Sequence, residues 1–235
     1  MEVRGVAVDV VRKDIRNVHL AVYPPDGRVR LAVPRRVSDE AARLAVVDRW
    51  GWVLRQREAF ARQPRQSARE MVTGESHYVW GRRVRLSITE DDARPRVVRT
   101  GPAKLELRVR PGTPTALRQS ILKEWYRREL KAVVGPMVEA WEPRLSVRVG
   151  SWQVRQMRTR WGSCAPRTGR ILVNLELAKK PREALEFIVV HEMVHLIERT
   201  HSDRFRALMD RYLPDWRRRR EILNRTPLAH EDWAY

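Results

Sequence analysis

The chain has 235 residues, 43% of them hydrophobic and 33% charged, which is typical of a soluble globular protein of one large or two small domains. Its 48 Lys and Arg residues outnumber its 29 Asp and Glu residues, and the resulting charge of +19 should give some non-specific affinity for nucleic acid. The single cysteine, Cys164, excludes an internal disulfide framework, and no apolar run is long enough to span a bilayer, so we expect a cytoplasmic protein without a membrane partner.

The first part of the chain, residues 1–112, is predicted to be a β-rich region with one helix. Branched and alternating residues predict strands at 3–11, 17–23, 28–33, 78–88, 97–98 and 105–109. A Pro-Pro-Asp-Gly turn is expected at residues 24–27 and a polar loop at 63–76. Ser38 is the expected N-cap of the helix, whose apolar positions recur at helical spacing as far as residue 54.

Residues 113–235 are predicted to form an α+β domain. Thr113 as N-cap and Pro114 at the first helical position begin a long helix, which we expect to bend or stop at Gly135 and Pro136. Strands are predicted to follow at 145–149, 152–157 and 171–177. A helix beginning after Pro181 and another capped by Ser202 complete this domain.

The helix after Pro181 carries the pattern His191-Glu192-Met193-Val194-His195. Residues four apart lie on one helical face about 6 Å from each other, so both histidines can bind one metal ion. Glu192 is placed to reach a metal-bound water instead of the metal, as the general base of a zinc peptidase does. The apolar run before His191 favours a metal site, because titratable groups are seldom buried there without a partner.

A catalytic zinc needs a third protein ligand and one open position. His201 is the main candidate, because it follows His195 by six residues and lies beyond the expected end of the helix. Glu198 is the alternative, but a straight helix would carry it about 10 Å along the axis from His191. Glu198 or Asp203 is also a candidate hydrogen-bond acceptor for a ligand imidazole.

The helix that carries His191 and His195 is called the metal helix below. Two residues that precede it in the sequence allow more than one interpretation. Trp161 is expected in the core, with the wall of a cleft as the alternative. Cys164 is expected to be a small buried thiol, with a redox switch or a fourth metal ligand as alternatives.

Four blocks of the sequence follow one another in a fixed order: Arg160-Trp161-Gly162-Ser163-Cys164, the stretch Ile171 to Leu177 with Asn174, the metal helix, and His201-Ser202 with Phe205. In these blocks the chain resembles the YgjP-like family of metallopeptidases. Thr200 stands where the family commonly has Asn. The resemblance implies a small zincin, in which a backing helix and a small sheet support the metal helix, but it implies no particular substrate.

The sequence therefore predicts a zincin-like metallopeptidase with one zinc ion on His191, His195 and His201 and with Glu192 as general base. Its substrate would be a peptide or protein. Two alternatives belong to other classes: a protease that acts at DNA, as in the SprT-like proteases, and a nucleic-acid-binding zinc protein without turnover. The oligomeric state cannot be derived from these patterns.

Overall fold

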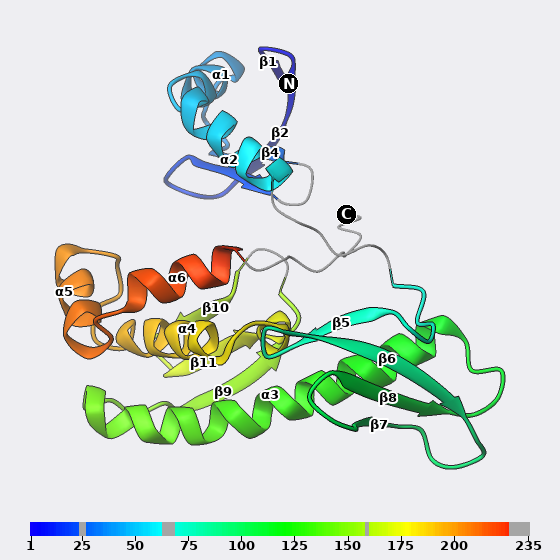
Figure 1. Cartoon of the computed structure of the whole chain (residues 1–235). Helices are drawn as coiled ribbons and strands as arrows, with labels where there is room; N and C mark the ends of the chain where they lie inside the picture. Colours follow the sequence, from blue (N-terminus) through cyan, green and yellow to red (C-terminus); the bar gives the residue numbers. More distant parts are fainter. Residues whose placement is uncertain (24–26, 63–68, 158–159, 226–235) are drawn as a thin grey trace. The chain divides into compact units, whose positions relative to one another are not determined.

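The computed structural model describes residues 1–23, 27–62, 69–157 and 160–225 and has the predicted α+β composition (Figure 1). It divides into two compact units, with the division between residues 62 and 69. The sequence pattern had indicated a boundary at residue 112 instead. The difference arises because the strands between residues 76 and 109 contribute to the same hydrophobic core as the metal helix. The turn predicted at 24–27 and the loop predicted at 63–76 lie partly outside the described residues.

The first unit is a four-stranded sheet followed by two helices. Its strands are β1 (Glu2–Val3), β2 (Val6–Lys13), β3 (His19–Tyr23) and β4 (Arg28–Pro34), in the order β1-β2-β4-β3. The helices are α1 (Asp39–Val47) and α2 (Trp50–Arg62), so one predicted helix is in fact two. Ser38 caps α1 as predicted, because its hydroxyl accepts a hydrogen bond from the Ala41 amide at 3.2 Å.

The second unit begins with a sheet of the same topology. Its strands are β5 (Ser76–Val79), β6 (Arg82–Glu90), β7 (Arg96–Arg99) and β8 (Lys104–Val109), in the order β5-β6-β8-β7. In both sheets the two central strands are parallel and each edge strand is antiparallel to its neighbour. Both also begin with a hairpin whose two turn residues have positive φ, Arg4-Gly5 in one and Trp80-Gly81 in the other.

Helix α3 (Thr115–Leu145) is longer than predicted, since it continues through Gly135 and Pro136. A proline within a helix removes one backbone hydrogen bond. Here the same helix face remains buried on both sides of Pro136, from Val134 to Val138 and Trp141, and this burial maintains the helix. Because α3 ends only at Leu145, the strand predicted at 145–149 does not form.

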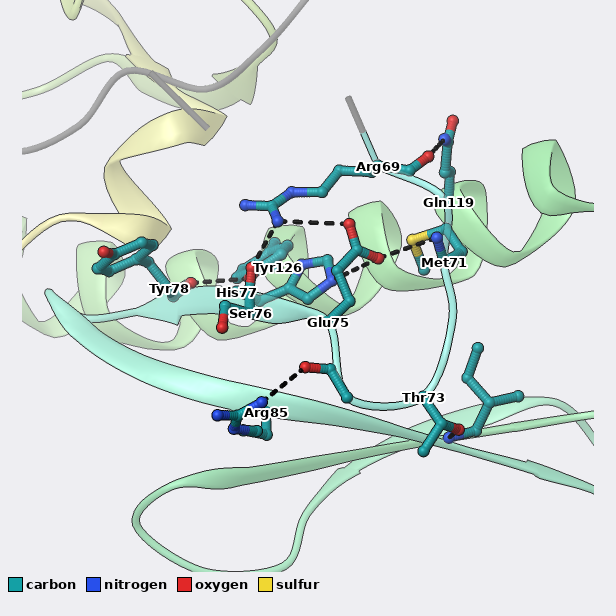
Figure 2. Close-up of polar contacts among 12 residues, drawn as sticks. Arg69, Met71, Thr73, Glu75, Ser76, His77, Tyr78, Arg85, Gln119 and Tyr126 are labelled. Atoms are coloured by element: carbon teal, nitrogen blue, oxygen red, sulfur yellow. Dashed lines mark hydrogen bonds and ion pairs between the residues drawn. The ribbon is translucent and has the colours of Figure 1, made fainter. Parts of the chain in front are cut away.

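Hydrogen bonds attach β5 and the segment before it to α3 (Figure 2). Gln119 on α3 donates to the Arg69 carbonyl at 3.0 Å, and the Tyr126 hydroxyl donates to the Tyr78 carbonyl at 2.7 Å. Between these contacts, the buried His77 ring lies with Nε2 3.4 Å from a carboxylate oxygen of Glu75. The first sheet of this unit is thereby attached along α3.

A third, three-stranded sheet lies next to the metal helix. Its strands are β9 (Ser151–Arg155), β10 (Gly162–Ala165) and β11 (Arg170–Asn174), in the order β10-β11-β9, so β10 is an edge. A 3-10 helix, η1 (Leu175–Lys179), follows β11 and leads to α4 (Arg182–Val194), α5 (Asp203–Tyr212) and α6 (Trp216–Arg225). Both α3 and β10 contact α4. Among the described residues, no helix combines the length and apolar character needed to cross a membrane.

Candidate metal centre

Helix α4 positions the two central histidines. Pro181 is its N-cap, and nine of its residues, from Ala184 to Val194, are buried, so the helix is enclosed on most sides. His191 and His195 stay partly exposed on the remaining face, with ring centroids 4.9 Å apart. The regular helix ends at His195, its C-cap. This end allows the chain to turn back towards the helix.

A short corner between α4 and α5 brings His201 to the other histidines. Ser202 begins α5 by accepting a hydrogen bond from the Phe205 amide at 3.2 Å, as the sequence predicted. The buried Phe205 ring packs against all three imidazoles, with centroid distances of 4.6 to 4.9 Å. The contacts with Phe205 hold the three imidazole rings close together.

The three histidines form a group whose ligand atoms all lie within 4.8 Å of one another. Nε2 of His201 is 3.0 Å from Nε2 of His191. Two nitrogens on a tetrahedral zinc ion are about 3.4 Å apart, given Zn–N distances of about 2.0–2.1 Å, so the group fits zinc after a small adjustment. Neither Glu198 nor Cys164 belongs to this group among the described residues.

The carbonyl oxygen of Glu198 lies 3.0 Å from Nδ1 of His195. A carbonyl can only accept, so Nδ1 carries the proton and Nε2 keeps its lone pair for a metal. The acceptor is therefore the main chain of Glu198, whereas its carboxylate accepts from the Thr200 amide and hydroxyl at 3.3 and 3.1 Å. Asp203, the other candidate acceptor, pairs with Arg206 at 2.6 Å.

Burial and neighbouring groups favour the neutral form of His191 and His201 by lowering the pKa of both. Burial, followed by the neighbouring His195, His201 and Arg220, lowers the pKa of His191 to about 3. Burial and the same kind of neighbours also lower the pKa of His201. Only a neutral imidazole can bind a metal ion, so these shifts favour metal binding over protonation near neutral pH.

Glu192 lies beside this group but is not part of it. Its side chain is buried, with 6% of the residue exposed, and burial raises the pKa of its carboxyl to about 7 even though Arg160 opposes the change. A carboxylate with such a pKa can both accept and release a proton near neutral pH. That property suits a general base.

Trp161 directly precedes β10, and Cys164 lies on this strand. Trp161 is partly buried against the core, and the Lys180 ammonium lies 5.3 Å from the centroid of its ring. Cys164 is also half-buried, and burial together with the charge of Glu192 raises the pKa of its thiol to about 11. A thiol with a raised pKa is a poor metal ligand and a poor nucleophile, which favours the interpretation as a buried thiol.

Two supporting residues had received no role from the sequence. The buried Asn174 side chain donates to the carbonyls of Met157 and Arg160, both at 2.7 Å, and thereby holds the segment before β10. Trp141 on α3 donates to the Glu186 carboxylate on α4 at 3.1 Å. Asn174 stands at the end of an apolar strand, within a block that resembles the family, whereas the contact of Trp141 depends on tertiary packing.

Comparisons with known proteins gave a family match and a similar solved structure. A family model described as "YgjP-like, metallopeptidase domain" matches residues 16–226. No curated protein matches the sequence. Among solved structures, the metallopeptidase zymogen of Pyrococcus abyssi abylysin is similar, with 22% identity, a TM-score of 0.36, and coverage of 40% of this chain and 90% of that one.

Proposed function

The chain belongs to the YgjP-like metallopeptidase family, and from this premise we propose that it hydrolyses peptide bonds with one zinc ion on His191, His195 and His201. The observation that carries the proposal is the convergence of three imidazoles, two of them on the helix that also carries the buried Glu192 carboxylate. Three protein ligands leave one position open, as in catalytic zinc sites, whereas structural sites use four. The rival interpretation as a structural zinc protein therefore has less support.

A bound zinc ion would polarise the substrate carbonyl and make water acidic enough to act as a nucleophile near neutral pH. In the proposed reaction, Glu192 accepts a proton from the attacking water. It then transfers the proton to the amine that leaves when the peptide bond breaks. Its raised pKa of about 7 suits both transfers. The Glu198 carbonyl keeps His195 in the tautomer that binds the metal.

The substrate would be an extended peptide or protein segment. Strand β10 is the edge of its sheet and contacts the metal helix, and an exposed edge can add a peptide as a further strand. In the same proposal, α3 is the backing helix of a zincin-like arrangement. The Trp141–Glu186 hydrogen bond links it to α4.

The deciding experiment compares wild-type protein with Glu192→Gln in a peptide-library digest, together with zinc analysis. Gln has nearly the same shape but cannot accept the proton, so hydrolysis should fall by a factor on the order of 10² to 10⁴ while zinc remains bound. Glu183→Gln is the matched control, because Glu183 lies on the first turn of the same helix and at its surface. Loss of zinc from Glu192→Gln would show that Glu192 is a ligand and would refute this mechanism.

A further inference from the structure

Gly162, the first residue of β10, lies directly against the carboxylate of Glu192. A Cβ atom placed on Gly162 would be 2.5 Å from Oε1, 2.7 Å from Cγ and 2.9 Å from Cδ of Glu192. Distances below about 3 Å between such atoms require one of the groups to move. The glutamate side chain therefore occupies the space that any side chain at position 162 would need.

The main chain gives no other reason for glycine at this position. Gly162 does not have a positive φ, and it pairs in regular antiparallel register with Val173. Any L-residue can adopt this conformation. Gly150 differs, since a Cβ there would be 2.4 Å from the main-chain oxygen of Thr168. At Gly162 the conflict is with one side chain, that of Glu192.

Glu192 has little freedom to avoid an added methyl group. It is buried, it lies on a helix that is enclosed by the core, and its neighbours Met193 and Val194 have no measurable exposure. Side chains in such packed surroundings do not change rotamer without strain. An added methyl group must therefore displace the carboxylate or push β10 away from α4.

We propose that Gly162 is a positioning residue for Glu192. Because Gly162 has no side chain, the Glu192 carboxylate can occupy its place beside the metal ligands. This inference rests on the hydrolysis proposed above. Gly162 acts only through Glu192 and contributes no reacting atom. It also lies at the start of the edge strand proposed to pair with the substrate. One residue thus fixes the distance between the general base and this strand.

The kinetic test uses the full-length zinc protein. Gly162→Ala should keep one zinc per chain and an unchanged KM, while kcat falls at least tenfold and at most to the level of Glu192→Gln. The double variant Gly162→Ala/Glu192→Gln should be no slower than Glu192→Gln alone, because both changes remove the same function. Gly135→Ala is the control, since a Cβ there meets only the Trp152 ring at an ordinary 3.4 Å. Wild-type kcat in Gly162→Ala, or further slowing in the double variant, would overturn the inference.

A second test measures the contact without any activity. Gly162→Ala should lower the Tm of the zinc protein by several degrees, because overpacking strains the fold. In a Glu192→Ala background the same change should have little effect on Tm, since all three crowded atoms are then missing. An equal fall in both backgrounds would show that the strain comes from elsewhere. If the wild-type protein cleaved no peptide, the proposed function would fail, and this Tm comparison would still decide whether Gly162 positions Glu192.

Discussion

Nε2 of His201 and Nε2 of His191 lie 3.0 Å apart, although His191 is on α4 and His201 follows it by ten positions, in the corner between α4 and α5. Two imidazole nitrogens approach in this way when they share a metal ion or a proton. We therefore predict that His201→Ala loses most of the bound zinc, because two remaining ligands hold the ion weakly. Zinc content after dialysis against a weak chelator is the measurement.

Glu198→Ala is the matched comparison for this prediction. The Glu198 carboxylate is held by Thr200, and the His195 ring uses only the main-chain carbonyl of residue 198. Alanine retains that carbonyl, so Glu198→Ala should keep its zinc. The opposite pattern, with zinc lost from Glu198→Ala and kept in His201→Ala, would show that the third ligand has been assigned wrongly.

The buried His77 should make the fold sensitive to acid. Burial, followed by the charge of Arg69, lowers its pKa from 6.5 to about 4, although Glu75 opposes the change. Between these two pH values the unfolded chain binds a proton at this histidine and the folded chain does not, so stability falls as the pH falls from 6.5 to about 4. A shift of this size corresponds to about 3 kcal/mol. Figure 2 shows the ring next to Glu75 and Arg69.

Urea denaturation at a series of pH values tests this effect. His77→Leu should flatten the decline in unfolding free energy between pH 6.5 and 4, because leucine does not bind a proton. His19→Leu, at an exposed position of the first unit, is the control and should leave the decline as it is. A variant at position 77 with the same pH dependence as the wild type would assign the acid sensitivity to other groups.

The three histidines that the structure brings together could be named from the sequence because their spacing is local. His191 and His195 share a helical face by helical geometry alone, and Ser202 marks a helix start just after His201. The course of α3 through Pro136 could not be predicted, since it depends on burial of Val138 and Trp141 against other elements. The contact of Gly162 with Glu192 could not be predicted for the same reason, since only the packing of β10 against α4 brings the carboxylate to this glycine.

Asn174 is predicted to stabilise the segment that leads into β10. Asn174→Ala removes the donors for the carbonyls of Met157 and Arg160, and a buried group without a partner costs about 1–3 kcal/mol, so the two together should cost about 2–6 kcal/mol. Asn174→Asp should be nearly as harmful, since it keeps the acceptor for the Glu176 amide but also lacks the donors. Urea denaturation measures both losses. A stable Asn174→Asp protein would show that the acceptor, not the donors, is what the fold requires.

The final prediction is that proteolysis does not require DNA, which separates the proposed peptidase from a protease that acts at DNA. The longest run of arginines is Arg217 to Arg220, and its first three members form ion pairs: Arg217 with Asp210, Arg218 with Glu183 at 3.3 Å, and Arg219 with Glu186 at 2.5 Å. A net charge of +19 should still attract DNA weakly, and this affinity should fall steeply with salt because it depends on counterion release.

The assay for this prediction is cleavage of casein at about physiological salt, with and without single-stranded or duplex DNA. We expect the same rate in all three samples, and in each of them Glu192→Gln should be slower by a factor on the order of 10² to 10⁴. The triple variant Arg217→Ala/Arg218→Ala/Arg219→Ala tests the run directly: it should bind DNA about as weakly as the wild type, because its charges are already neutralised by carboxylates. A rate that appears only when DNA is added, and disappears in the triple variant, would favour the DNA-associated protease and locate its DNA contact on α6.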